Sequence, residues 1–195
     1  SGQSEAINTM LRRTLSVLTS LLILQYAHVA SATEDSISLT FLGTGAPRPS
    51  LDRYGPSILV EAGSQRLLVD AGPGMRERLF QAGGFELLTD INLILLTHLH
   101  FDHTISVPGL WLTGWLFGRK SPMTVYGPEG TSNMMNNFEA AYAWDIEYRE
   151  TVGVHEQGSE LISYDIEPGV FYEKDGLKIT AFNVEHMPID MNTGD

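Results

Sequence analysis

The sequence predicts an α/β fold, and three observations lead to this prediction. A short apolar run at 91–96, β-branched at its start, has the length and composition of a buried strand. Between 131 and 149 apolar residues recur every three or four positions, which is the period of an amphipathic helix. Two β-hairpin patterns turn at Gly63-Ser64 and at Lys174-Asp175-Gly176. The chain has 195 residues, a length that suits one domain with a hydrophobic core.

Residues 1–32 are expected to lie outside this domain. A positively charged start at 10–13 precedes a largely apolar stretch at 14–29, and Ala30-Ser31-Ala32 matches a signal-peptidase cleavage pattern. We therefore interpret 1–32 as a signal peptide with an upstream extension, and 33–195 as the mature domain. The apolar stretch is short and interrupted by polar residues, so no stable membrane span is expected, although an anchor is the alternative. The predicted location is periplasmic or secreted.

The remaining elements follow from local patterns. In order, we expect strands at 38–42, 57–62 and 65–71, a helix at 75–81 ending at Gly83-Gly84, the strand at 91–96, a strand at 123–126, the helix at 131–149 with Thr131 or Ser132 as its N-cap, and strands at 170–172 and 177–184. Asp145 and Arg149 are spaced to form an ion pair on the helix surface. Trp111 and Trp115 are expected to pack in the core, and the alternative is that one of them lines a substrate pocket.

The segment directly after the strand at 91–96 carries the candidate chemistry. His98, His100, Asp102 and His103 lie within six positions, and they include three of the six histidines in the chain. Side chains at i and i+2 of an extended segment share a face, so His98 and His100 can converge on one point. The following turn redirects Asp102 and His103 towards a neighbouring point. Imidazole and carboxylate ligands suit zinc, with manganese or iron as alternatives, so this spacing predicts a binuclear metal site.

The His-x-His-x-Asp-His motif after a hydrophobic strand resembles the metallo-β-lactamase superfamily of metal-dependent hydrolases. The resemblance to its ribonuclease Z-like and arylsulfatase-like branch extends over most of residues 38–195. It rests on four further segments in the order seen in that branch: 42–45, 70–74, 127–131 and 184–186. The branch contains tRNA 3′-end endonucleases, arylsulfatase-type enzymes and certain cyclic-nucleotide phosphodiesterases. It implies an αββα sandwich, of which this chain would supply the N-terminal part, because two further ligands would lie beyond Asp195.

The resemblance also implies roles for individual residues. His98, His100 and His186 would hold one zinc, and Asp102 and His103 would hold the other, with Asp102 also orienting the attacking hydroxide. His155 is the alternative third ligand, but His186 is favoured because it follows a predicted strand. Asp70 would support the histidines without binding metal itself. Two zinc ions are expected in the full-length protein.

The net charge and the loop at 46–57 are the two features from which we predict the substrate. The formal net charge is −12, and the 12 Lys and Arg residues are scattered along the sequence. Such a chain is expected to repel polyanions, so nucleic acid is an unlikely partner by this criterion. The loop is closer to the arylsulfatase-like group than to the tRNA endonucleases. We therefore expect an exported binuclear zinc hydrolase that attacks an aryl sulfate or small phosphodiester with a metal-bound hydroxide. A homodimer is the assembly considered for it. The alternatives are a tRNA 3′-processing endonuclease and a non-catalytic metal-binding domain.

Overall fold

The computed structural model describes residues 36–186, and its centre is a six-stranded sheet. The strands run in the spatial order β1 to β6: Ile37–Gly43, Ser57–Ala62, Gln65–Val69, Leu93–Leu95, Met123–Gly127 and Leu161–Asp165. The first three strands pair antiparallel, and β3 to β6 pair parallel. Because the carboxyl ends of parallel strands meet at one edge, the loops after β3, β4 and β5 are gathered there.

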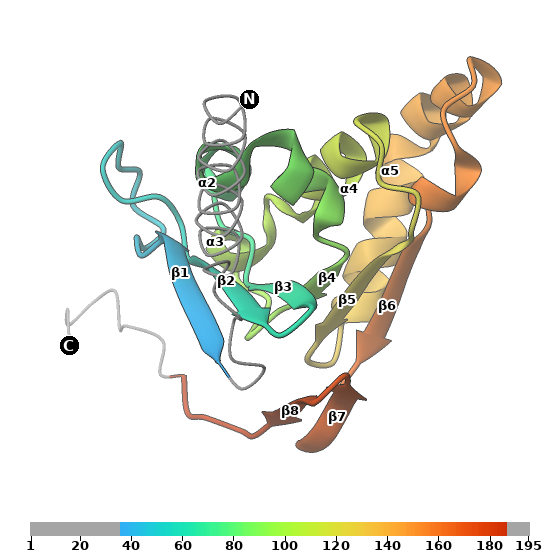
Figure 1. The fold of residues 1–195 in the computed structure, drawn as a ribbon. Coiled ribbons are helices and arrows are strands. Elements are labelled where there is room, and N and C mark those ends of the chain that lie inside the picture. The colour runs from blue at the N-terminus through green and yellow to red at the C-terminus, as the bar shows by residue number, and fades with distance from the viewer. Residues whose placement is uncertain (1–35, 187–195) are drawn as a thin grey trace, which may run out of the picture. The chain divides into compact units, whose positions relative to one another are not determined.

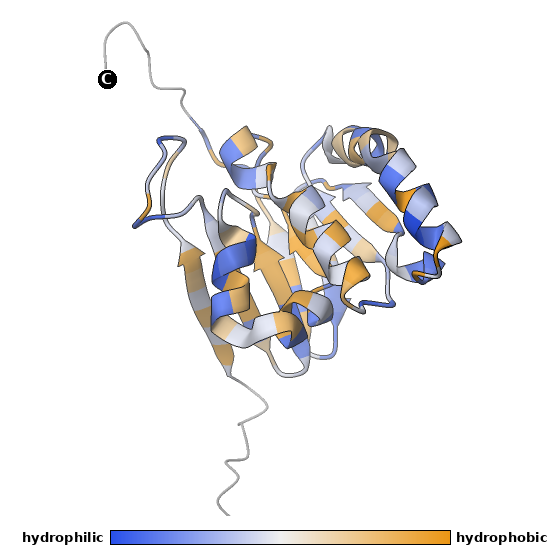
Figure 2. Ribbon diagram, turned by 90° about the horizontal axis from the view of Figure 1, so that it is seen from above, coloured by the Kyte–Doolittle hydropathy of each residue, from blue (hydrophilic) through white to orange (hydrophobic). Residues whose placement is uncertain are grey.

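Helices cover one face of this sheet (Figure 1). They are α2 (Met75–Asp90), α3 (Phe101–Thr104), α4 (Val107–Leu116) and α5 (Thr131–Thr151), and a 3₁₀ turn at Glu156–Gly158 follows them. Side chains from α2, α4 and α5 join sheet residues such as Leu68 and Ile94 in the larger hydrophobic core. Figure 2 shows strands that are largely apolar beneath helices with both polar and apolar residues. This layer arrangement follows from burying one apolar stripe of each helix against the sheet.

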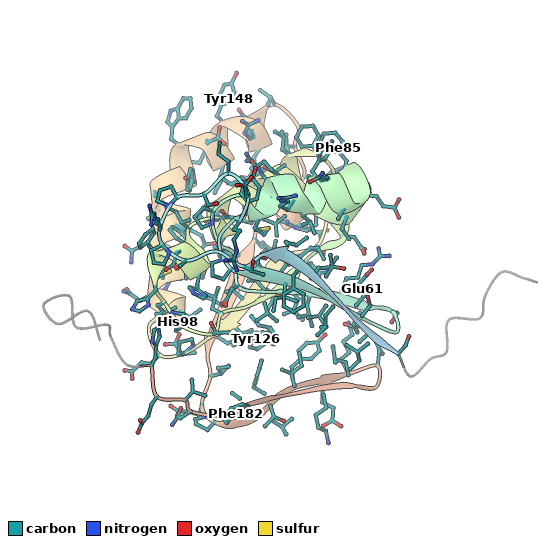
Figure 3. The ribbon with its side chains drawn as sticks, turned by 90° about the vertical axis from the view of Figure 1, so that its left-hand side faces the viewer. Glu61, Phe85, His98, Tyr126, Tyr148 and Phe182 are labelled. Carbon is teal, nitrogen blue, oxygen red and sulfur yellow. The ribbon has the colours of Figure 1, made fainter. Side chains whose placement is uncertain are left out.

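The opposite face of the sheet packs against a hairpin formed by β7 (Gly169–Lys174) and β8 (Leu177–Ala181). Leu67, Leu93 and Leu95 are buried there against Phe171 and other apolar hairpin residues. Tyr126 lies between the sheet and the hairpin (Figure 3). The described residues therefore form a helical layer, a main sheet and a second, smaller sheet. The α/β prediction is confirmed, and the layers match the expected part of an αββα sandwich.

Several elements differ from the sequence prediction. The backbone angles of Gly83 and Gly84 are not helical, so the first part of α2 ends at the predicted glycine pair. A second helical segment, which was not predicted, continues from there to Asp90 and buries Leu87 and Leu88 in the core. Strand β6 was not predicted as a separate strand. Neither Thr131 nor Ser132 caps α5, because the carboxylate of Asp165 accepts hydrogen bonds from the backbone N–H groups of Gly130 and Ser132.

The two tryptophans of α4 are buried, which decides between the two roles predicted for them. Trp111 and Trp115 are 0% and 2% exposed, and their indole N–H groups donate hydrogen bonds to the carbonyl oxygens of Ser159 and His155. They are core residues, so the alternative of a tryptophan-lined substrate pocket is wrong. The predicted ion pair between Asp145 and Arg149 is confirmed at 2.8 Å.

The expected signal peptide at 1–32 lies outside the described residues, so its interpretation stays a prediction. Among the helices of residues 36–186, none combines the length and the apolar composition needed to cross a membrane.

Candidate metal centre

Three of the predicted ligand residues, His98, His100 and His186, meet at one edge of the molecule. His98 and His100 come from the segment directly after β4, and His186 comes from the extended segment after β8. One ring nitrogen from each lies within 4.8 Å of the others. The ring centroids of His186 are 4.7 Å from His98 and 4.9 Å from His100. Figure 3 shows His98 at this edge of the sheet. The chain thus joins segments almost ninety positions apart into one cluster.

Two nitrogen atoms of this cluster lie close to the spacing that one zinc ion requires. His98 Nε2 lies 3.0 Å from His100 Nδ1. Two nitrogens bound to the same tetrahedral zinc at normal bond lengths are about 3.3 Å apart, so a small adjustment would admit the ion. Partial burial lowers the pKa of His98, and nearby His103, His100 and His186 lower it further. This favours the neutral imidazole, which is the form that binds metal.

Asp102 and His103 form a second pair beside the three-histidine cluster. Both belong to α3, and the residue Asp102 is 3% exposed. Asp102 Oδ2 lies 3.8 Å from His103 Nε2, and the His103 ring centroid is 4.0 Å from that of His98. These two side chains could contribute a carboxylate oxygen and a ring nitrogen to a second metal. The structure therefore gathers the five predicted ligands at one edge of the sheet, in two adjacent groups.

The carboxylate of Asp70 forms hydrogen bonds with His103 and with Thr97, the residue before His98. Its Oδ2 accepts a hydrogen bond of 2.8 Å from His103 Nδ1, and its Oδ1 accepts one of 2.8 Å from the backbone N–H of Thr97. Asp70 is buried at the end of β3, and its φ of 61° is unusual for a residue other than glycine. It is not a member of the candidate ligand cluster. Its contacts fit the orienting role that the resemblance implies.

Close backbone packing fixes the turn that carries Asp102 and His103. The N–H of Ala71 donates to the carbonyl oxygen of His103 at 2.7 Å, and the N–H of Ser106 donates to the carbonyl oxygen of Ala71 at 2.9 Å. A Cβ atom at Gly72 would lie 2.5 Å from the carbonyl oxygen of Asp102. Only glycine therefore permits this approach between the loop after β3 and the metal turn.

No role was predicted for Thr97, although its hydroxyl group contacts both Asp70 and His98. A hydroxyl residue directly before the first histidine was the available signal. His155, the alternative ligand, precedes the 3₁₀ turn at 156–158 and is absent from the cluster. The geometry therefore favours His186 as the third residue at this point.

Comparison with known proteins places this geometry in a family. Residues 37–191 match the family model described as Anti-Pycsar protein Apyc1. A ribonuclease Z from Mycobacterium sp. (strain KMS) is 34% identical over 163 residues, which cover 81% of this chain and 56% of that protein. A ribonuclease Z from Bradyrhizobium diazoefficiens is 36% identical over 157 residues, covering 78% of this chain and 47% of that protein. The chain thus spans about half the length of these relatives.

A solved structure supports the same fold. The long form of RNase Z from yeast superposes with a TM-score of 0.50 at 20% identity, covering 70% of this chain and 19% of that one. This similarity concerns the fold, because the sequences have diverged.

These relatives correct two expectations. The preference for a hydrolase of aryl sulfates is wrong, because the relatives are ribonucleases Z. The judgement that nucleic acid is an unlikely partner is wrong for the same reason. Net charge sums over the whole chain, whereas recognition of a phosphate backbone depends on charges placed locally, so a total of −12 does not exclude it. The predicted periplasmic or secreted location stays a prediction. The chain belongs to the Anti-Pycsar protein Apyc1 family, within the ribonuclease Z-like branch of the metallo-β-lactamase superfamily.

Proposed function

We propose that this chain forms part of a metal-dependent phosphodiesterase that processes the 3′ ends of tRNA precursors. One observation carries the proposal: His98, His100 and His186 converge beside Asp102 and His103, in a chain about one-third identical to ribonuclease Z proteins. The convergence supports a metal-dependent hydrolase, and the relatives support RNA as its substrate.

Each side chain has a separate task in this proposal. His98, His100 and His186 hold one metal, whereas Asp102 and His103 contribute to a second. Zinc suits these nitrogen and carboxylate ligands, and manganese or iron are alternatives; the chain has no cysteine to offer. A bound metal would lower the pKa of water and neutralise charge on phosphate oxygens. Asp102 has a second task in addition to metal binding: its carboxylate can accept a hydrogen bond from the attacking water and orient that water towards phosphorus.

Cleavage of a tRNA precursor with a 3′ extension, by the complete protein, tests the proposal. We expect cleavage with zinc or manganese, and its loss after chelation. His100→Ala and Asp102→Asn should each lower the rate by at least about a hundredfold, because the first removes a candidate ligand and the second removes the negative charge of another. His155→Ala is the matched control and should retain activity. Metal-independent cleavage, or full activity in His100→Ala, would contradict the proposal.

A second candidate substrate is a small nucleotide phosphodiester. The matched family model covers residues 37–191, and its description does not name a ribonuclease. The same protein should be tested on cyclic nucleotides at matched concentrations. Cleavage of these without cleavage of tRNA precursors would favour this second candidate.

A further inference from the structure

The hydroxyl group of Thr97 connects Asp70 to His98. Thr97 Oγ1 lies 2.8 Å from Asp70 Oδ2 and 3.0 Å from Asp70 Oδ1. The same oxygen lies 3.0 Å from His98 Nδ1. All three distances are within the range of hydrogen bonds that involve hydroxyl groups and imidazole nitrogens. A continuous chain of hydrogen bonds therefore runs from a buried carboxylate, through Thr97, to the first histidine of the cluster.

The direction of these bonds is determined by the number of protons available. A threonine hydroxyl has one proton to donate, and a carboxylate can only accept. The proton of Thr97 therefore points to Asp70, and towards His98 the hydroxyl oxygen can only accept. The proton of that second bond must then be on His98 Nδ1. A neutral imidazole with its proton on Nδ1 has its lone pair on Nε2.

We propose that Thr97 is a positioning residue that fixes the tautomer of His98, so that Nε2 is presented to the metal. His98 Nε2 is also the atom that faces His100 Nδ1 at 3.0 Å, in the centre of the cluster. The inference rests on the proposed metal centre for its purpose, but the tautomer itself is a property of the metal-free chain. It assigns a function to a residue that is not itself a ligand.

His103 provides an independent comparison within the same site. Its Nδ1 contacts Asp70 Oδ2 directly at 2.8 Å, so its proton is held on Nδ1 without an intermediary. Asp70 therefore directs two histidines: His103 by direct contact, and His98 through Thr97. These histidines belong to the two adjacent groups of the site. A single carboxylate thus sets the orientation of one nitrogen donor in each group.

The position of Thr97 separates this role from a packing role. Thr97 is exposed, and its backbone N–H makes its own 2.8 Å hydrogen bond to Asp70 Oδ1. Replacing the hydroxyl by a methyl group in Thr97→Val keeps the shape of the side chain and this backbone bond. The variant removes only the link between Asp70 and His98. The fold should therefore be retained, and any effect on the metal should come through the imidazole.

The experiment is a long-range ¹H–¹⁵N spectrum of the histidine rings in the metal-free chain, followed by a zinc titration. In the wild type we expect His98 to carry its proton on Nδ1. Thr97→Val should move a measurable share of that proton to Nε2 and weaken zinc binding by about 10- to 100-fold, the usual effect of losing a residue that orients a ligand. Thr97→Ser should restore both values. Thr40→Val, a matched change at an exposed position in β1, should alter neither.

The spectrum tests the tautomer of His98, and the zinc titration tests the metal centre, so the two claims can fail separately. An Nε2-protonated His98 in the wild type, or an unchanged tautomer in Thr97→Val, would overturn the proposal. A wild-type chain with the expected tautomer but no affinity for zinc would leave Thr97 as the residue that sets the tautomer and would contradict the proposed function instead. A thermal melt of each variant confirms that the comparison is made between folded proteins.

Discussion

Asp70 Oδ2 and His103 Nδ1 are joined by a hydrogen bond of 2.8 Å, which links the end of β3 to the metal turn after β4. Asn tolerates the left-handed backbone of Asp70, so Asp70→Asn removes the charge while preserving the conformation. The amide can accept at only one oxygen and loses the charge that holds the imidazole proton. We expect zinc affinity to fall by about 10- to 100-fold in a competition titration.

The effect of Asp70→Asn should also exceed that of Thr97→Val, because Asp70 directs both His98 and His103. Equal affinities of Asp70→Asn and wild type would show that this carboxylate has no part in organising the metal centre.

Gly72 tests the close packing behind the metal turn. An added Cβ would meet the carbonyl oxygen of Asp102 at 2.5 Å and backbone atoms of Gly55 and Pro56 at 2.6 and 2.7 Å. All of these contacts are with backbone, so they cannot be relieved by a change of rotamer. We expect Gly72→Ala to lower the melting temperature and to weaken zinc binding together. Gly109→Ala in α4 is the control, since its nearest neighbour would lie 3.8 Å away; if both variants behave alike, the argument from packing fails.

Arg119 joins the end of α4 to the turn at 156–158. Its side chain donates hydrogen bonds to the carbonyl oxygens of Trp111, Ser121 and Gly158, and burial lowers its pKa to about 10. Among the described residues, Arg119 forms no ion pair with a carboxylate. Arg119→Ala leaves buried carbonyl groups unpaired, so we expect roughly 2–4 kcal/mol of destabilisation in urea unfolding.

Arg149→Ala is the matched control for Arg119→Ala. It breaks a partly exposed ion pair with Asp145 four residues earlier on α5, an interaction that contributes about 0.5 kcal/mol or less. A loss of stability in Arg119→Ala no larger than in this control would contradict the role assigned to the buried guanidinium group.

Asp165 makes the start of α5 sensitive to pH. Hydrogen bonds from the backbone N–H groups of Ser132 and Gly130 lower its pKa below the ordinary 3.8. A carboxylate whose pKa is lower in the folded state stabilises the fold above its unfolded value, and this contribution is lost as the pH falls through the folded value. Asp165→Asn should therefore melt below the wild type at pH 6, and the difference should shrink below pH 3.8. A difference that is independent of pH would refute this explanation.

The parts of the site that were predictable depend on local spacing. A buried strand followed by His98-x-His100-x-Asp102-His103 can be recognised without knowing the rest of the fold, and β4 places these residues at the carboxyl edge as expected. His186 was predicted because a three-histidine point needs a third member. In the structure, a ring nitrogen of His186 lies within 4.8 Å of a ring nitrogen of each of the other two histidines.

The parts that were missed depend on contacts between distant segments. Thr97 and Asp70 are 27 positions apart, and Asp165 reaches Ser132 across 33, so no local pattern pairs them. The second helical segment of α2, after the glycine pair, buries Leu87 and Leu88 in the core, and this burial is not visible in the local sequence pattern. The substrate prediction failed because a negative net charge and the resemblance of the loop at 46–57 do not identify the ester that such a metal centre cleaves.

The most direct test of the metal centre is zinc binding by the 195-residue chain, measured in parallel for wild type, His186→Ala and His155→Ala. Three protein ligands suffice for one catalytic-type zinc, so we predict about one firmly bound zinc per wild-type chain. His186→Ala should lose it, because the cluster is reduced to two neighbouring residues, whereas His155→Ala should bind like the wild type. Unchanged binding in His186→Ala, or its loss in His155→Ala, would contradict the assignment of the cluster that supports the proposed function.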